Sequence, residues 1–217
     1  MINENLQKVR GQISDVCARI NKDPDKITIV CVTKARGVSQ IQEAIGLGLG
    51  NIGENKVQEA QEKYQQISGV KWHMIGHLQS NKAKDAVKIF DLIHSVDSLS
   101  LAQEIDKQAA KINKVQSVML EVKTSWEATK FGFLPQALTD ACAVIFKLHN
   151  VSIKGLMTIA PVVKNAKEAA HYFALLRQLR DKMNSHWLLS MGMSDDFQVA
   201  IEEGADIIRV GRSIFSC

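Results

Sequence analysis

The sequence predicts an α/β fold in which a single domain, residues 1–217, forms a closed (β/α)8 TIM barrel with an extra N-terminal helix. Eight short apolar runs alternate with longer segments that have the period of an amphipathic helix. No stretch rich in Pro, Ser or Gly interrupts this order, and the chain holds only 3 prolines. Strict alternation of strand and helix indicates parallel strands joined by right-handed crossovers, and eight such units favour a closed barrel over an open doubly wound sheet.

The chain begins with a segment whose apolar side chains recur along one helical face, namely Leu6, Val9, Ile13, Val16 and Ile20. This segment lacks the apolar core of a signal peptide, and nowhere do roughly 18 apolar residues run together. We therefore expect a soluble, cytoplasmic protein that does not bind a membrane.

The predicted strands are the runs 27–33, 51–53, 72–75, 92–96, 117–122, 152–157, 187–190 and 206–210. Helical patterns lie between them, among others at 39–48, 57–67, 100–112, 135–148 and 166–183. The run 51–53 is the weakest of the strands, because it is short and contains a glycine, which strands disfavour. Without it, an open sheet would again be an alternative.

Composition argues against several classes of site. The formal net charge is +4, and the lysines are spread over the predicted helices, which is typical of solvated helix faces rather than of a nucleic-acid surface. The 4 cysteines form no CxxC pair and the 6 histidines no HExxH, so neither a disulfide framework nor a metal site is predicted. No GxGxxG follows a strand, and no GxxxxGK[ST] or GxSxG motif is present.

Polar residues and glycines gather directly after several of the predicted strands. In a parallel barrel the C-terminal strand ends carry the chemistry, because the loops there can vary without disturbing the core. Such residues follow the first, second, third, seventh and eighth strands, at 33–36, 53–55, 76–82, 191–196 and 211–213. The pattern predicts a functional site at this end of the barrel.

Lys34 comes directly after the apolar, β-branched first strand. On position alone, a lysine there is typical of a side chain that reaches into solvent. The alternative is an amine beside apolar walls, where burial disfavours the ammonium form and makes the lysine a nucleophile toward an aldehyde. Pyridoxal 5′-phosphate (PLP) is the common cofactor aldehyde that lysines capture in this way.

The loops after the seventh and eighth strands are the candidate phosphate site, as is usual in such barrels. Gly211 lets the backbone approach a ligand closely, and Arg212 and Ser213 open a short helix whose N–H groups favour an anion. Met193 and Ser194 precede the next predicted helix. Ser194 suits either a phosphate contact or a helix cap.

Arg209 lies one residue before the end of the eighth strand. A buried arginine normally pairs with a carboxylate, which is one interpretation. The other is that it faces the pyridine nitrogen of the cofactor. Because arginine keeps its proton, it would then donate a hydrogen bond and leave that nitrogen unprotonated, so the ring would be a weak electron sink.

Seven segments occur in a fixed order across nearly the whole chain: VTK at 32–34, GENKVQE at 53–59, WHMIGHLQSNK at 72–82, SWEATKFG at 125–132, GLMTI at 155–159, SMGMSDD at 190–196 and RVGRSIF at 209–215. Together they resemble the pyridoxal phosphate homeostasis protein family, which is related to the N-terminal barrel of alanine racemase. Any one segment alone is a weak signal, whereas the ordered series is a strong one.

The resemblance implies roles for particular residues. Lys34 is the Schiff-base lysine, Asn55 borders the cofactor ring and Arg209 faces the pyridine nitrogen, while the phosphate is received by Ser194, Gly211 and the residue after it. Two departures stand out. Lys123 replaces the usual Asn and adds a charge near the barrel mouth, and Arg212 stands where Thr or Ser is frequent. A guanidinium or Ser213 would then have to supply the missing phosphate contact.

The resemblance also implies a function. Its members carry PLP or regulate its supply, usually without demonstrated turnover and usually as monomers, which makes apo PLP-dependent enzymes the expected partners. An amino-acid racemase is the alternative, but racemisation needs a second base opposite the lysine. The only tyrosines, Tyr64 and Tyr172, lie in predicted helices. A phosphosugar enzyme would need a carboxylate base at a strand end, for which Glu54 and Glu121 are the candidates. We therefore expect a PLP carrier rather than an enzyme.

Overall fold

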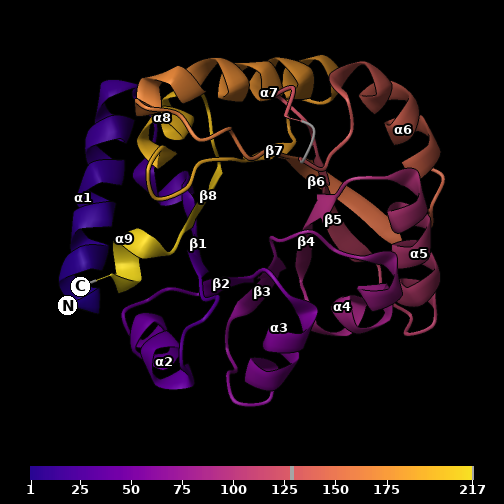
Figure 1. The fold of residues 1–217 in the computed structure, drawn as a ribbon, viewed down its shortest axis with the longest axis horizontal. Helices are drawn as coiled ribbons and strands as arrows, with labels where there is room; N and C mark the ends of the chain where they lie inside the picture. The colour runs from indigo at the N-terminus through magenta and orange to yellow at the C-terminus, as the bar shows by residue number, and fades with distance from the viewer. Residues whose placement is uncertain (128–129, 217) are drawn as a thin grey trace.

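A computed structural model describes residues 1–127 and 130–216, so two residues of the SWEATKFG segment and Cys217 lie outside the described residues. Its strands are parallel and close into a barrel in sequence order: β1 (Thr28–Val32), β2 (Asn51–Glu54), β3 (Lys71–Met74), β4 (Leu92–Val96), β5 (Gln116–Glu121), β6 (Val151–Met157), β7 (Leu188–Ser190) and β8 (Ile207–Val210) (Figure 1). The predicted barrel is confirmed, and each predicted strand end is met to within one residue.

Helices surround the barrel (Figure 1). They are α1 (Ile2–Arg19), α2 (Val38–Gly46), α3 (Val57–Tyr64), α4 (Ala83–Ile89), α5 (Leu99–Ala110), α6 (Leu138–Ile145), α7 (Ala170–Met183), α8 (Phe197–Glu202) and α9 (Arg212–Phe215). Short 3-10 turns lie at Pro24–Lys26, Ser80–Lys82, Pro135–Ala137 and Ala166–Ala169. Among the described residues, every helix is too short or too polar to cross a lipid bilayer.

The extra N-terminal helix α1 packs against α8 and α9, next to the C-terminal end of the chain (Figure 1). Leu6, Val9, Ile13 and Val16 are buried there, as their spacing predicts. Ile20 was predicted to share this face, but the helix ends at Arg19 and Ile20 is 37% exposed. α1 therefore supports the side of the barrel on which the β7 and β8 loops lie.

Two apolar clusters form, one between barrel and helices and a smaller one inside the barrel. The inner cluster consists of Val30, Ile75, Leu92, Met119, Met157 and Ile207. Alternate residues of each strand point into a barrel, so this cluster identifies which residues face inward. This cluster fills part of the barrel interior, and the other inward-pointing residues of the same strands include polar side chains.

The glycine that made the second strand weak has a packing reason. A Cβ on Gly53 would lie 2.7 Å from Val30 Cγ1 and 3.0 Å from Ile75 Cδ1 inside the barrel. β2 nevertheless pairs with β1 on one side and β3 on the other. The second strand therefore exists, and the open sheet is excluded.

Candidate cofactor-binding site

Lys34 lies in a tight turn at the C-terminal end of β1. The Arg36 N–H donates to the Thr33 carbonyl at 3.1 Å, and Ala35 has a φ of 56°. Lys34 follows Val32 by two residues, in phase with the inward-facing side of the strand. Its side chain is exposed in the structure. Of the two interpretations of Lys34, the structure therefore agrees with the side chain that reaches into solvent and not with the amine beside apolar walls.

A buried ionic cluster holds the backbone of this turn. Lys63, on α3, donates to the Thr33 carbonyl at 2.7 Å and to Oε1 of Glu54 and Glu59 at 2.6 and 2.7 Å. Thr33 Oγ1 donates to Glu54 Oε1 at 2.6 Å, and the Ala35 N–H donates to Glu59 Oε1 at 2.6 Å. Both residues that flank Lys34 are thereby fixed.

Glu54 is committed to this cluster. It follows the inward-facing Gly53, so its side chain points outward to Lys63 rather than into the barrel. Burial raises the pKa of Glu54 above its ordinary value, although Lys63 and Thr33 act in the opposite direction. Its position does not suit a catalytic base at the mouth, which weakens the phosphosugar-enzyme alternative.

Arg209 is buried inside the barrel, 4% exposed, on the strand next to the one that carries Lys34. Nη1 donates to Ser190 Oγ at 2.6 Å and Nη2 to the Thr158 carbonyl at 2.9 Å. Burial lowers the pKa of Arg209 to about 10, so the guanidinium stays charged at neutral pH. Among the described residues no carboxylate lies within ion-pair distance of it, so the expected pairing of a buried arginine is not seen.

Glu121, at the end of β5, is a second charged-type side chain whose electrostatic field reaches Arg209. It is 7% exposed, and burial, followed by the charge of Asp97, raises the pKa of Glu121 to about 7. Arg209 opposes this rise. The carboxyl is therefore partly protonated at neutral pH and offsets only part of the Arg209 charge.

The β7 and β8 loops lie against each other, as the phosphate hypothesis requires. The Ser213 N–H donates to Ser194 Oγ at 3.3 Å, and Ser213 Oγ donates to the Ser194 carbonyl at 3.5 Å. α8 begins only at Phe197, with Asp196 at its N-cap position, so Ser194 does not cap this helix. The helix-cap interpretation of Ser194 is wrong.

The remaining residues of the predicted phosphate site are less converged. The Arg212 guanidinium is exposed and pairs with Asp195, so it is turned to the surface rather than available as a replacement for a hydroxyl. The backbone N–H of Met193 donates to Asp196 Oδ1 at 2.6 Å. Gly211 is required by packing, since a Cβ there would lie 3.0 Å from Val32 Cβ and from its carbonyl oxygen.

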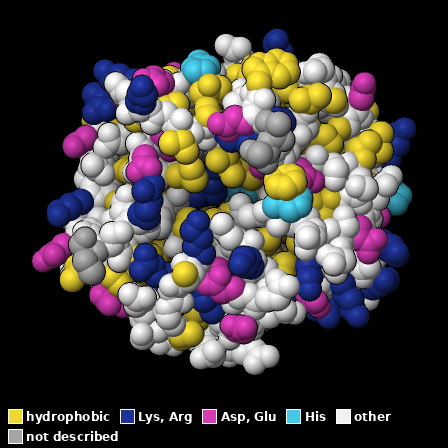
Figure 2. Space-filling view, viewed as in Figure 1, with side chains coloured by type: hydrophobic (Ala, Val, Ile, Leu, Met, Phe, Trp, Pro, Cys, Tyr) yellow, Lys and Arg dark blue, Asp and Glu magenta, His cyan; other side chains and the backbone are white. Residues whose placement is uncertain are grey.

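Asn55 is half-buried directly after β2. Gly76, in the loop after β3, packs on its backbone, and a Cβ on Gly76 would overlap the Asn55 carbonyl and Cα. Three separate cavities border the predicted residues: one of about 440 Å³ beside Asn55, one of about 310 Å³ beside Ser194 and Ser213, and one of about 320 Å³ beside Met193. Figure 2 shows the molecule hollowed near the middle of the view, with Lys and Arg side chains at the edge of the hollow and within it.

The sequence pattern did not identify the groups that hold the site. Ser190 and Thr158 fix Arg209, and Lys63 with Glu59 fixes the turn of Lys34. The alternation of side chains along a strand could have identified Ser190. It is a polar residue in an apolar strand, and it lies on the same face as Leu188, two residues earlier. Among the described residues, no group of three or more His, Cys, Asp or Glu side chains forms a metal site.

Neither tyrosine lies near Lys34. Tyr64 ends α3, is 44% exposed and contacts Trp72, near the start of β3, with ring centroids 5.6 Å apart. This places it at the N-terminal end of the barrel, opposite the mouth. Tyr172 lies in α7, outside the barrel. Among the described residues, no tyrosine can act as the second base that a racemase uses.

Comparison with known proteins places the chain in a family. The sequence model of the family "Alanine racemase, N-terminal domain" matches residues 5–217. Two curated relatives, both named pyridoxal phosphate homeostasis protein, come from Aquifex aeolicus and Pseudomonas aeruginosa. The first is 40% identical over 98% of this chain and 96% of its own length, and the second 36% identical over 99% and 94%.

Solved structures agree. PipY of Synechococcus elongatus without PLP is 36% identical with a TM-score of 0.88, and PipY with PLP bound is 35% identical with a TM-score of 0.85, both over 100% of each chain. Alanine racemase of Clostridium difficile shares only the fold, at 16% identity and a TM-score of 0.77 over 98% of this chain and 59% of its own. The chain belongs to the pyridoxal phosphate homeostasis protein family, built on the alanine racemase N-terminal domain.

Proposed function

We propose that this protein binds PLP at the C-terminal mouth of its barrel and stores or delivers it in intracellular PLP homeostasis, without catalytic turnover. Arg209 is the observation that carries the proposal. Only two of the five N–H groups of its guanidinium are used by Ser190 and Thr158. A buried cation whose other donors have no partner among the described residues, on the strand that pairs with β1, suits an anionic ligand with a ring acceptor. The relatives' names and the PLP-bound PipY support the same ligand.

Each residue has a defined task in this proposal. Lys34 would hold PLP through its exposed amine, and Arg209 would hold the pyridine nitrogen as a hydrogen-bond donor. Asn55 borders the ring. The phosphate is received where the β7 and β8 loops meet, by Ser194, Gly211 and Ser213, with Met193 and Arg212 at the border of the site. Bound PLP would supply an aldehyde and an electron-accepting ring.

The positions of the tyrosines relative to Lys34 support the absence of turnover. A racemase needs a second acid or base on the opposite face of the substrate, and both tyrosines lie elsewhere in the fold. A ring nitrogen that accepts a hydrogen bond from Arg209 is also a weak electron sink. The proposal also holds that the protein is a cytoplasmic, single-domain monomer whose partners are PLP and apo PLP-dependent enzymes.

A titration with PLP tests the proposal. The purified protein is expected to develop the visible absorption band of a lysine-bound cofactor, which Lys34→Ala abolishes and Lys84→Ala, at an exposed α4 position, leaves intact. The loaded protein is then expected to restore activity to an apo-aminotransferase. If the band does not form, the proposed PLP binding is wrong. Robust racemisation of common amino acids would contradict the absence of turnover and favour the alternative function, an amino-acid racemase.

A further inference from the structure

A row of hydrogen-bonded side chains crosses the interior of the barrel. It begins at Arg209 on β8 and passes to Ser190 on β7 at 2.6 Å. From Ser190 Oγ it reaches His94 Nδ1 on β4 at 2.9 Å, and from His94 Nε2 it reaches His73 Nδ1 on β3 at 2.9 Å. His73 Nε2 then meets Asn51 Oδ1 on β2 at 3.1 Å. Five strands thus contribute to one chain of polar groups.

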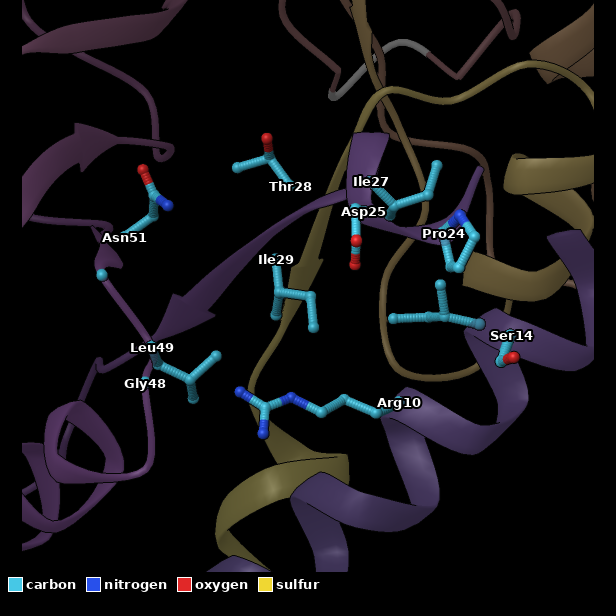
Figure 3. Close-up of a pocket in the computed structure, with 12 residues that line it drawn as sticks. Arg10, Ser14, Pro24, Asp25, Ile27, Thr28, Ile29, Gly48, Leu49 and Asn51 are labelled. Carbon is cyan, nitrogen blue, oxygen red and sulfur yellow. The ribbon is translucent and has the colours of Figure 1, made fainter. Parts of the chain in front are cut away.

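This row of hydrogen-bonded side chains connects the two ends of the barrel. Arg209 belongs to the candidate cofactor site at the C-terminal mouth. Asn51 is the first residue of β2 and borders a cavity of about 470 Å³ at the N-terminal end, together with Arg10, Asp25 and Thr28 (Figure 3). His73 and His94 lie between them, 4% and 0% exposed.

The chemistry of the groups fixes the direction of every bond. The Asn51 carbonyl oxygen only accepts, so His73 carries its proton on Nε2 and donates to it. In a neutral His73 ring Nδ1 then accepts, so His94 carries its proton on Nε2 and donates to His73 Nδ1. His94 Nδ1 in turn accepts the hydroxyl proton of Ser190, whose Oγ accepts from Arg209. Burial lowers the pKa of His73 to about 4 and that of His94 well below its ordinary value, which agrees with two neutral rings.

We propose that Ser190, His94 and His73 are positioning residues, whose one-way chain of hydrogen bonds ending at Asn51 holds the Arg209 guanidinium as a fixed donor at the cofactor ring. Protonation of His73 on Nδ1 would set that N–H against the N–H of His94 Nε2, so the arrangement with two neutral rings is selected. The Thr158 carbonyl holds the second guanidinium nitrogen and fixes its plane. The role of Arg209 at the cofactor ring rests on the proposed function, whereas the row of hydrogen bonds inside the barrel does not.

Nitrogen-15 NMR of the histidine side chains in the cofactor-free protein tests the chain directly. The expected result is that His73 and His94 are both neutral Nε2–H tautomers at pH 7. An Nδ1–H tautomer or an imidazolium at either position overturns the proposal. Asn51→Leu removes the final acceptor and is expected to change the His73 signals.

A serine pair tests whether the chain acts as a unit. Ser190→Ala removes the link between Arg209 and His94, and is expected to move the nitrogen signals of His73, which Ser190 does not bond. Ser95→Ala is the matched control: Ser95 is buried next to His94, and its hydroxyl has no partner among the described residues. Unchanged His73 signals in Ser190→Ala, or equal changes in both variants, overturn the proposal. Circular dichroism verifies that the variants are folded.

PLP binding tests the link to the site. Ser190→Ala is expected to lower PLP affinity at least about tenfold, the effect of one lost hydrogen bond to a charged group, whereas Ser95→Ala is not. Wild-type affinity in Ser190→Ala overturns the positioning role. Failure of the wild-type protein to bind PLP would instead reject the proposed function. The tautomers of His73 and His94 would still test the row of hydrogen bonds.

Discussion

Lys63 lies at 7% exposure with two glutamates and a backbone carbonyl as its only bonded neighbours among the described residues. All three of its N–H groups are used. The arrangement explains how an exposed Lys34 can keep a defined position: the two residues that flank it are bonded to a buried cluster, while the lysine side chain itself is free to react.

Lys63→Met is expected to destabilise the protein by about 3–5 kcal/mol, because it leaves the buried carboxylate of Glu54 without its cation. Urea unfolding measures the loss. Lys88→Met is the control, since the Lys88–Asp85 pair is exposed and such pairs contribute about 0–1 kcal/mol. Equal effects of the two substitutions would show that the Lys63 cluster does not hold the turn.

Glu121 predicts a pH dependence of stability. Because its folded-state pKa of about 7 lies above the ordinary value of 4.5, the unfolded chain releases the proton first as pH rises. Its contribution is fully present below about pH 4.5 and is lost as pH rises to about 7, a change of roughly 3 kcal/mol.

Glu121→Gln removes this titration. The difference in unfolding free energy between the variant and the wild-type protein is expected to change in favour of the variant from pH 4.5 to 7.5, with other groups cancelling in the comparison. Urea unfolding at several pH values measures it. If the unfolding free energies of the two proteins changed in parallel with pH, the raised pKa of the buried Glu121 carboxyl would be refuted.

At the scale of elements, α1 supports the loops to which the proposed function assigns the phosphate. It packs against α8 and α9, and Asn5 Nδ2 donates to the carbonyls of Ile214 and Ser216 at 3.2 and 2.8 Å. The helix is thus tied to the segment that follows Gly211. Loosening α1 is expected to affect both stability and the β8 loop.

Leu6→Ala is expected to cost about 2–5 kcal/mol, because Leu6 is fully buried and the truncation leaves a cavity. Gln7→Ala, on the exposed face of the same helix, is expected to stay within about 0.5 kcal/mol. Chemical unfolding compares the two. A Leu6 variant as stable as the Gln7 variant would mean that α1 is not part of the core.

The elements were predictable because each strand is a short apolar run bounded by polar residues and glycines. Gly53 weakened one prediction for a reason that is visible only in three dimensions, its contact with Val30. The partners of Arg209 were not predictable, since Ser190 and Thr158 come from other strands. The exposure of Lys34 agrees with one of the two interpretations that its position allowed, since the predicted first strand already ended before it.

At the scale of the whole molecule, the barrel keeps the residues that the proposed function assigns to PLP apart from the residues that hold them in place. Its mouth presents Lys34, Arg209 and the paired β7 and β8 loops, whereas the interior and α3 hold them in place. Neither tyrosine faces Lys34, since Tyr64 lies at the far end of the barrel and Tyr172 outside it. This division suits a protein that binds a reactive aldehyde and later releases it unchanged.

The identity of the residue that captures PLP tests the central claim most directly. The protein is incubated with PLP, reduced with borohydride, digested and mapped by mass spectrometry. The predicted result is a single reduced phosphopyridoxyl group on the peptide that contains Lys34, retained in Lys84→Ala and lost in Lys34→Ala. Labelling scattered over surface lysines, or an unlabelled Lys34 in the wild-type protein, would contradict the account.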